Sequence, residues 1–84
     1  LLHKGLPKIC QKVGEEATEV VVAALAESRE ELLEESADLL YHLLVLWAAK
    51  EVRPQEVYDV LYRRRIETDI KKKKQRKNAK KQGN

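Results

Sequence analysis

The chain has 84 residues and a formal net charge of +3, and it contains three Gly, two Pro, one Cys and no Phe. A chain of this length folds as one small domain whose monomer buries little apolar surface, and its shortage of turn-forming and aromatic residues favours an all-α fold over a sheet. One cysteine excludes an internal disulfide, and no apolar run reaches the ~20 residues of a membrane span, so we expect a cytoplasmic protein without a membrane partner.

The first predicted helix begins near Pro7, because proline is tolerated in the first helical turn, where its missing N–H has no partner to lose. Apolar residues then recur at helical spacing, at Ile9, Val13, Ala17, Val20 and Ala24. This spacing predicts a helix that runs to about Ala26. Because the chain opens with Leu1 rather than Met, we expect part of the N-terminus to be missing.

The second predicted helix begins after Ser28, which has the spacing of a capping box with Glu31. The short link to the first helix predicts an antiparallel hairpin. The second helix is apolar on more than one side, at Leu32, Leu33, Leu39, Leu40, Leu43, Leu44, Leu46 and Trp47. Burial of the second side against another copy of the chain would explain this pattern, so we expect a homodimer or a higher homo-oligomer.

A third predicted helix follows the short connection at residues 50–53, and it begins at Pro54 and carries Val57, Val60 and Leu61. Beyond it, residues 71–81 are strongly basic and lack apolar periodicity, which predicts fraying into a disordered tail. The expected organisation is a helical domain over residues 1–70 and a basic tail over residues 71–84. The hairpin and the third helix are expected to form a helical bundle by dimerisation.

Several acids lie where a core-forming pattern predicts apolar side chains. At about 100° per residue, Glu16 falls in the middle of the apolar stripe of the first helix and Glu19 at its edge, while Glu15 lies further out. Glu35 and Asp38 share one side of the second helix. When the helices pack antiparallel, the two pairs of carboxylates are expected to converge.

Converging carboxylates repel one another and lose hydration when they are partly buried, so a positive charge should compensate them. Mg²⁺ fits this set, because it favours carboxylate and water ligands and leaves positions for substrate phosphates. A cation held there lowers the pKa of a bound water, so a hydrolase of this kind needs no protein nucleophile. Lys8 and Lys12 lie beside the acidic edge and are candidate contacts for substrate phosphates.

Other interpretations of these residues stay open at this point. A solvated helix face explains four of the acids better than a site does: Glu15, Glu30, Glu31 and Glu34. For the two convergent pairs, the interpretation as a solvated surface and the interpretation as a metal site are balanced. Lys12 can simply form an ion pair with Glu16 at i+4. His42 is either a ligand or, as we favour, a residue oriented by Asp38 or by another helix. Cys10 is expected to be buried and without a redox role.

Two segments carry a family resemblance. Residues 12–20 read Lys-Val-Gly-Glu-Glu-Ala-Thr-Glu-Val, and residues 35–46 read Glu-Ser-Ala-Asp-Leu-Leu-Tyr-His-Leu-Leu-Val-Leu. Over about residues 4–64 the chain resembles the phosphoribosyl-ATP pyrophosphohydrolase family, within the all-α nucleotide pyrophosphohydrolase (MazG-like) superfamily. Glu-Glu-x-x-Glu and Glu-x-x-Asp are shared by that superfamily, whereas Ala-Asp-Leu-Leu-Tyr-His-Leu-Leu is more particular to this family.

The resemblance implies hydrolysis of the α,β-phosphoanhydride of phosphoribosyl-ATP to phosphoribosyl-AMP and pyrophosphate, a step of histidine biosynthesis. It also implies a dimer and a catalytic Mg²⁺ held by Glu16, Glu19, Glu35 and Asp38, with Glu15 as a further candidate ligand. The chain departs from the family pattern at Gln11, where Lys is common, and in the basic tail.

Two other functions remain open from the sequence. A house-cleaning hydrolase of nucleoside or deoxynucleoside triphosphates would use the same Glu-x-x-Glu and Glu-x-x-Asp pattern. A non-enzymatic module whose tail binds nucleic acid is disfavoured, because the tail lacks interleaved aromatic residues and this function leaves the convergent acids unexplained.

Overall fold

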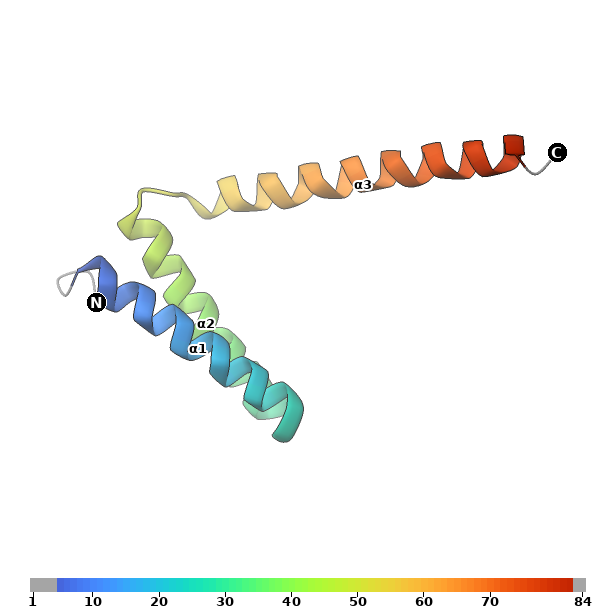
Figure 1. Ribbon diagram of the computed structural model, residues 1–84. Coiled ribbons are helices and arrows are strands. Elements are labelled where there is room, and N and C mark those ends of the chain that lie inside the picture. Colours follow the sequence, from blue (N-terminus) through green and yellow to red (C-terminus); the bar gives the residue numbers. More distant parts are fainter. Residues whose placement is uncertain (1–4, 83–84) are drawn as a thin grey trace. The chain divides into compact units, whose positions relative to one another are not determined.

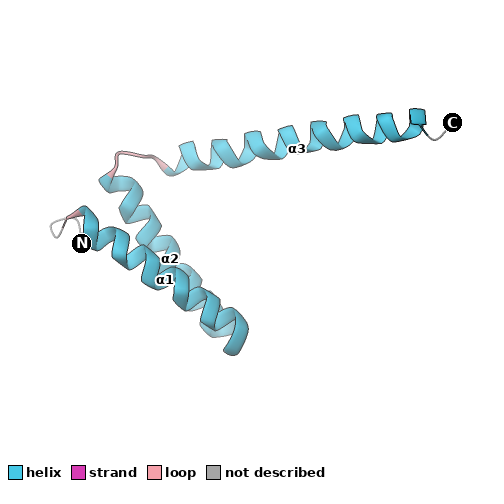
Figure 2. Ribbon diagram, in the orientation of Figure 1, coloured by secondary structure: helices cyan, strands magenta, loops and turns pink. Residues whose placement is uncertain are grey.

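The computed structural model describes the backbone of residues 5–82 and the side chains of residues 5–77. It consists of α1 (Leu6–Ala26), α2 (Arg29–Ala49) and α3 (Pro54–Gln82), as Figure 1 and Figure 2 show. The part of the chain that is described contains no strand. The all-α prediction is confirmed, as are the predicted end of the first helix at Ala26 and the start of the third at Pro54.

Gly5 allows the chain to enter α1. Its φ of 87° lies in the left-handed region, which a side chain disfavours, and Pro7 follows in the first turn. The carbonyl of Gly5 accepts a hydrogen bond from the Ile9 N–H at 3.3 Å, which starts the helical ladder.

A two-residue link of Glu27 and Ser28 joins α1 to α2, and the two helices lie side by side as an antiparallel hairpin (Figure 1). Glu27 and Ser28 are both extended, with φ of −123° and −77°, which ends one helix and allows the next to begin. The Ser28 hydroxyl accepts a hydrogen bond from the Glu31 N–H at 3.2 Å, so the predicted N-cap is confirmed.

The hairpin has a thin core. Among the described residues only Ile9 and Ala23, both on α1, are buried, each with 1% of its surface exposed. On α2, Leu32, Leu39, Leu43 and Leu46 are half-buried. Three other leucines of α2 are exposed: Leu33 (56%), Leu40 (47%) and Leu44 (38%). Thus α2 is apolar on a side that α1 does not cover.

The third helix continues further than the sequence predicts. It runs to Gln82, so the expectation that residues 71–81 leave the helix is wrong for the described backbone. Lys, Arg and Gln are good helix formers, and this local preference outweighs the lack of an apolar face. Every side chain of residues 61–77 is exposed. Residues 54–84 form a compact unit distinct from residues 1–53, while the proposed division at residue 70 stays a prediction.

Two further sequence expectations meet the structure here. Cys10 is exposed and has no disulfide partner among the described residues, so its predicted burial is wrong. It lies about 120° around α1 from the stripe that faces α2. Within residues 5–82, none of the helices is both long and apolar enough to cross a membrane.

Replacing Ser28 by Ala should destabilise the protein by about 0.5–2 kcal/mol, because the Glu31 N–H loses its cap acceptor. Chemical denaturation followed by circular dichroism measures this change. Ser36→Ala is the matched control, because Ser36 is exposed inside α2 and Ala is the better helix former there. Equal stability of Ser28→Ala and Ser36→Ala would contradict the capping role.

Candidate functional site

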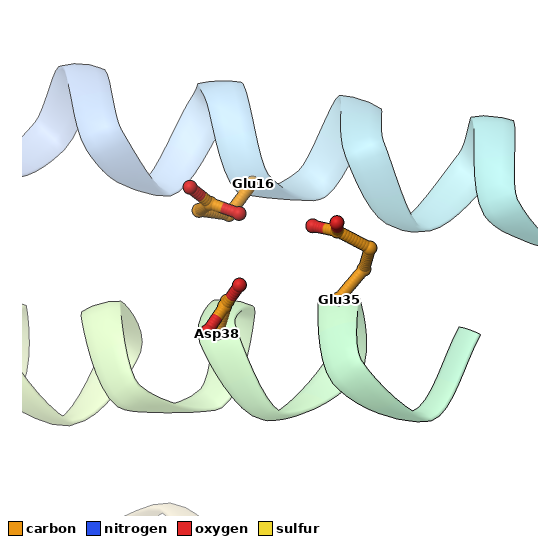
Figure 3. A group of neighbouring side chains, drawn as sticks. All are labelled: Glu16, Glu35 and Asp38. Carbon is orange, nitrogen blue, oxygen red and sulfur yellow. The ribbon is translucent and has the colours of Figure 1, made fainter. Parts of the chain in front are cut away.

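Three carboxylates from the two helices of the hairpin come together. Glu16 of α1 faces Glu35 and Asp38 of α2 across the gap between the helices, as Figure 3 shows. One carboxylate oxygen from each residue lies within 4.8 Å of the others. We refer to Glu16, Glu35 and Asp38 as the acidic cluster.

The antiparallel hairpin places the acidic cluster. Glu35 and Asp38 are three residues apart on α2, so they lie one helical turn apart on neighbouring positions of the same side. The two-residue link fixes the register of α1 against α2, which puts Glu16 opposite this pair. The sequence-based expectation that acids of the two helices converge therefore agrees with the geometry for three of the four predicted residues.

On α1, the burial of the acids agrees with their predicted positions relative to the apolar stripe. On α2, it does not. The Glu16 side chain is 14% exposed, whereas the neighbouring Glu15 side chain is 47% exposed. Glu35 is half-buried, but Asp38 is exposed. The sequence pattern places Asp38 among the acids at core-forming positions, but its side chain is exposed. About 60° around α2 from Glu35, Asp38 reaches the cluster from the edge of the packed side.

Glu19, the fourth predicted residue, stands beside the acidic cluster rather than in it. Its side chain is exposed, and it is not among the residues whose oxygens gather within 4.8 Å. It is nevertheless close enough that its charge acts on Glu35. Glu19 is thus placed to extend the negative field of the cluster from the next turn of α1.

The negative charge of the cluster is reflected in the pKa of Glu35. Partial burial raises this pKa above 4.5, and the charges of Glu19, Glu16 and Asp38 raise it further. A similar effect extends to the hairpin link, where a hydrogen bond with Glu31, then burial and nearby negative charges, raise the pKa of Glu27. At this end of the hairpin, the pKa values of two carboxylates, Glu27 and Glu35, are therefore raised.

Lys12 is the cation that contacts the cluster within the described chain. Its Nζ lies 3.7 Å from the Glu16 carboxylate and 3.3 Å from that of Glu15, so the predicted i,i+4 pair with Glu16 is confirmed. The hydrogen bond and charge of Glu15 raise the pKa of Lys12. Hydrogen bonds from Gln11 and Lys12 lower the pKa of Glu15.

Glu15 and Gln11 form an arrangement that the sequence analysis did not identify. The Gln11 amide donates to the Glu15 carboxylate at 2.8 Å, and Lys12 donates to it at 3.3 Å. The Glu15 carboxylate is therefore engaged by Gln11 and Lys12 and does not belong to the acidic cluster, although Glu15 is the direct neighbour of Glu16. The i,i+4 spacing of Gln11 and Glu15 was the available signal, because such pairs meet on a helix surface.

The remaining candidates lie near the hairpin without joining the cluster. Lys8 is half-buried one turn before Lys12, and its charge reaches Glu15. His42 is half-buried on α2, and its Nδ1 atom is buried without a hydrogen-bond partner. No hydrogen bond joins that atom to Asp38 or to another helix in the described chain, and the orientation expected for His42 stays a prediction. The His42 ring instead meets Tyr41 edge to face, at 5.1 Å between centroids.

The donor set of the acidic cluster suits a hard divalent cation. Three carboxylates supply oxygen ligands only, and such ligands favour Mg²⁺, Ca²⁺ or Mn²⁺ over softer metals. Burial and the charges of its acidic neighbours raise the pKa of Glu35, and a bound cation would favour its charged form. The cluster contains no Ser, Cys or His that could act as a covalent nucleophile.

The metal-free Glu35→Gln variant should melt at a higher temperature than the wild type at pH 7. Because the pKa of Glu35 is raised on folding, the folded state binds more protons than the unfolded state at pH values above about 4.5. The contribution of Glu35 to stability therefore falls as pH rises through its folded pKa. The advantage of the neutral variant should shrink as pH is lowered toward 4.5.

Thermal melts in EDTA, followed by circular dichroism across this pH range, measure the effect. Glu34→Gln is the control, because Glu34 is exposed on the same helix outside the cluster. A Glu35→Gln variant that melts at or below the wild-type temperature at pH 7 would argue against net repulsion in the cluster.

Comparison with known proteins places this site in a family context. Residues 1–65 match the family model described as phosphoribosyl-ATP pyrophosphohydrolase. This range contains α1, α2, the acidic cluster and the first turns of α3. The match therefore includes every residue discussed as part of the site.

Individual relatives carry the same name. The chain is 59% identical over 64 residues to a phosphoribosyl-ATP pyrophosphatase of Sulfurisphaera tokodaii, a match that covers 76% of this chain and 68% of the relative. It is 56% identical over 76 residues to that of Paramagnetospirillum magneticum, covering 90% and 70%. It is 57% identical over 65 residues to that of Pyrobaculum arsenaticum, covering 77% and 69%. The chain belongs to the phosphoribosyl-ATP pyrophosphohydrolase family.

Proposed function

We propose that this protein hydrolyses phosphoribosyl-ATP to phosphoribosyl-AMP and pyrophosphate in histidine biosynthesis. Membership of the family supports the reaction, because the matched relatives are named phosphoribosyl-ATP pyrophosphatases. The observation that carries the proposal is the convergence of Glu16, Glu35 and Asp38 from two helices within the matched range. Carboxylates brought together across a helix pair repel one another, and a bound cation would offset this repulsion.

Mg²⁺ is the cofactor that we propose for the acidic cluster. Glu16, Glu35 and Asp38 would hold it, and Glu19 would complete the set from the adjoining turn of α1. When bound, Mg²⁺ supplies charge neutralisation for the phosphates and lowers the pKa of a bound water. We do not assign Glu15 to this set, because its carboxylate is occupied by Gln11 and Lys12.

The chain's own residues have two tasks in this proposal. The cluster carboxylates concentrate negative charge at one place, which would repel a polyphosphate unless a cation is held between them. Lys8 and Lys12 present ammonium groups on α1 on the N-terminal side of the cluster, where they would contact phosphate oxygens of the substrate. Together these groups would orient the phosphate chain along the hairpin. A cytoplasmic location stays a prediction.

Glu16→Gln and Asp38→Asn should each lower kcat/KM for pyrophosphate release from phosphoribosyl-ATP by about a hundredfold or more, because each removes a charged ligand of the proposed cation. Glu34→Gln should keep wild-type activity, because Glu34 is an exposed acid of α2 outside the cluster. The assay uses purified protein with Mg²⁺ and is repeated with deoxynucleoside triphosphates. Full activity of Glu16→Gln would contradict the site, and a strong preference for deoxynucleoside triphosphates would contradict the substrate.

We further propose that the protein acts as a homodimer in which the exposed side of α2 is covered by a second copy. Leu33, Leu40 and Leu44 lie on the side of α2 that is turned away from α1, and each is at least 38% exposed in the single chain. Apolar side chains gathered on one helix face of a small protein mark a protein interface more often than a free surface. Packing two hairpins together would form a helical bundle.

Leu40→Glu should weaken this dimer strongly, because burying a leucine contributes roughly 1.5–3 kcal/mol and a two-fold interface contains the substitution twice. Sedimentation velocity over a concentration series measures the association. Leu25→Glu is the matched control, since Leu25 is 83% exposed at the far end of α1 and should leave the dimer intact. A wild-type monomer at micromolar concentration would contradict the proposal.

A further inference from the structure

Lys12 occupies a position between two neighbouring carboxylates with different roles. One of them, Glu16, belongs to the acidic cluster, and its oxygen lies 3.7 Å from the Lys12 Nζ. The other, Glu15, lies outside the cluster, and its carboxylate is 3.3 Å from the same nitrogen. The ammonium group therefore joins a carboxylate of the site to one outside it.

The charge of Lys12 compensates the cluster only in part. Among the cluster carboxylates, Lys12 forms an ion pair with Glu16 only, and its other ion pair within the described residues joins it to Glu15 outside the cluster. The Lys12 side chain is 30% exposed, so its ion pairs are reached by solvent and are weak enough to exchange. A divalent cation would bring greater charge to all three carboxylates at once.

Cation binding and the Lys12–Glu16 pair compete for the same group. A cation held by Glu16, Glu35 and Asp38 needs the Glu16 carboxylate, and it would repel an ammonium group a few ångströms away. The contact with Glu15 offers the ammonium group a place to remain on α1. Gln11 holds the Glu15 carboxylate from its other side at 2.8 Å, which keeps this second partner in position.

We propose that Lys12 is an exchangeable counter-ion of the site: it pairs with Glu16 in the metal-free protein, leaves it when a divalent cation binds, and stays anchored to Glu15. This inference rests on the proposed function, because it assumes that the cluster holds the cation. Lys12 thus lowers the affinity for the cation and limits the repulsion among the acids when the cation is absent. The released ammonium group is then free to face a phosphate of the substrate.

Direct metal binding tests the proposal without the reaction. Binding of Mn²⁺ to the full chain, without substrate, is measured by electron paramagnetic resonance, with Mg²⁺ added as competitor. Lys12→Gln should bind Mn²⁺ about 3- to 10-fold more tightly than the wild type, because a repelling charge next to Glu16 is removed. Lys12→Arg keeps the charge and should stay within about twofold of the wild type.

Lys8→Gln is the matched control, because it removes the same charge one turn earlier on α1, where no ion pair with Glu16 exists. It should change Mn²⁺ affinity by less than about twofold. Equal or weaker Mn²⁺ binding by Lys12→Gln than by Lys8→Gln would overturn the proposal. If the wild type itself does not bind Mn²⁺, the metal site of the proposed function fails, which is a distinguishable result.

Thermal stability gives an independent measurement on the same variants. In EDTA, Lys12→Gln should melt at a lower temperature than the wild type, because Glu16 loses its counter-ion. On addition of saturating Mn²⁺ its melting temperature should rise by more than that of the wild type, because the tighter ligand stabilises the folded state more. A smaller rise than in the wild type would contradict the exchange.

Discussion

Repulsion between carboxylates on two packed helices is the constraint on which the rest of this hairpin depends. The antiparallel packing of α1 on α2 places Glu16 opposite Glu35 and Asp38, with oxygens within 4.8 Å of one another. Such a cluster opposes the packing that creates it. The helix pair must therefore be held by other interactions, and the local charge must be compensated from outside the cluster or by a bound cation.

The interactions within one chain are modest for this purpose. Among the described side chains only Ile9 and Ala23 are buried, so the apolar contacts of a single hairpin contribute little against the repulsion. The exposed leucines of α2 offer further burial if a second copy covers them. Under the two proposals, dimerisation would stabilise the helix pair by burying apolar surface. Cation binding would stabilise it by offsetting the negative charge of the cluster.

The basic residues lie in the later part of α3, beyond the range of the family model. That model ends at residue 65 and the strongly basic residues begin at Lys71, although the 76-residue match to the Paramagnetospirillum magneticum relative extends into them. Residues 71–77 are helical and fully exposed, although lysines three and four residues apart repel one another on a helix. The acids of the hairpin have a chemical role in the proposed reaction, whereas that proposal assigns no role to the basic end of α3.

The sequence by itself determined the elements of the fold. Pro7, Ser28 and Pro54 act through backbone conformation and hydrogen bonds over one helical turn, so the helix starts that they predict agree with the structure. The low exposure of Glu16 beside the exposed Glu15 also followed from the 100° step of a helix, because both residues lie on one continuous element. The expected loss of helix beyond Ile70 was wrong. The helix propensity of these residues keeps the chain helical there, although the segment has no apolar face.

Only the tertiary structure decided which acids meet. Glu19 shares the spacing of a ligand pair but stays outside the cluster, and Asp38 joins the cluster while remaining exposed. Glu15, the direct neighbour of Glu16, also stays outside the cluster. The physical reason is that helical periodicity fixes the direction of each side chain around its own axis, whereas a distance between two helices depends on their register, their separation and the reach of each side chain.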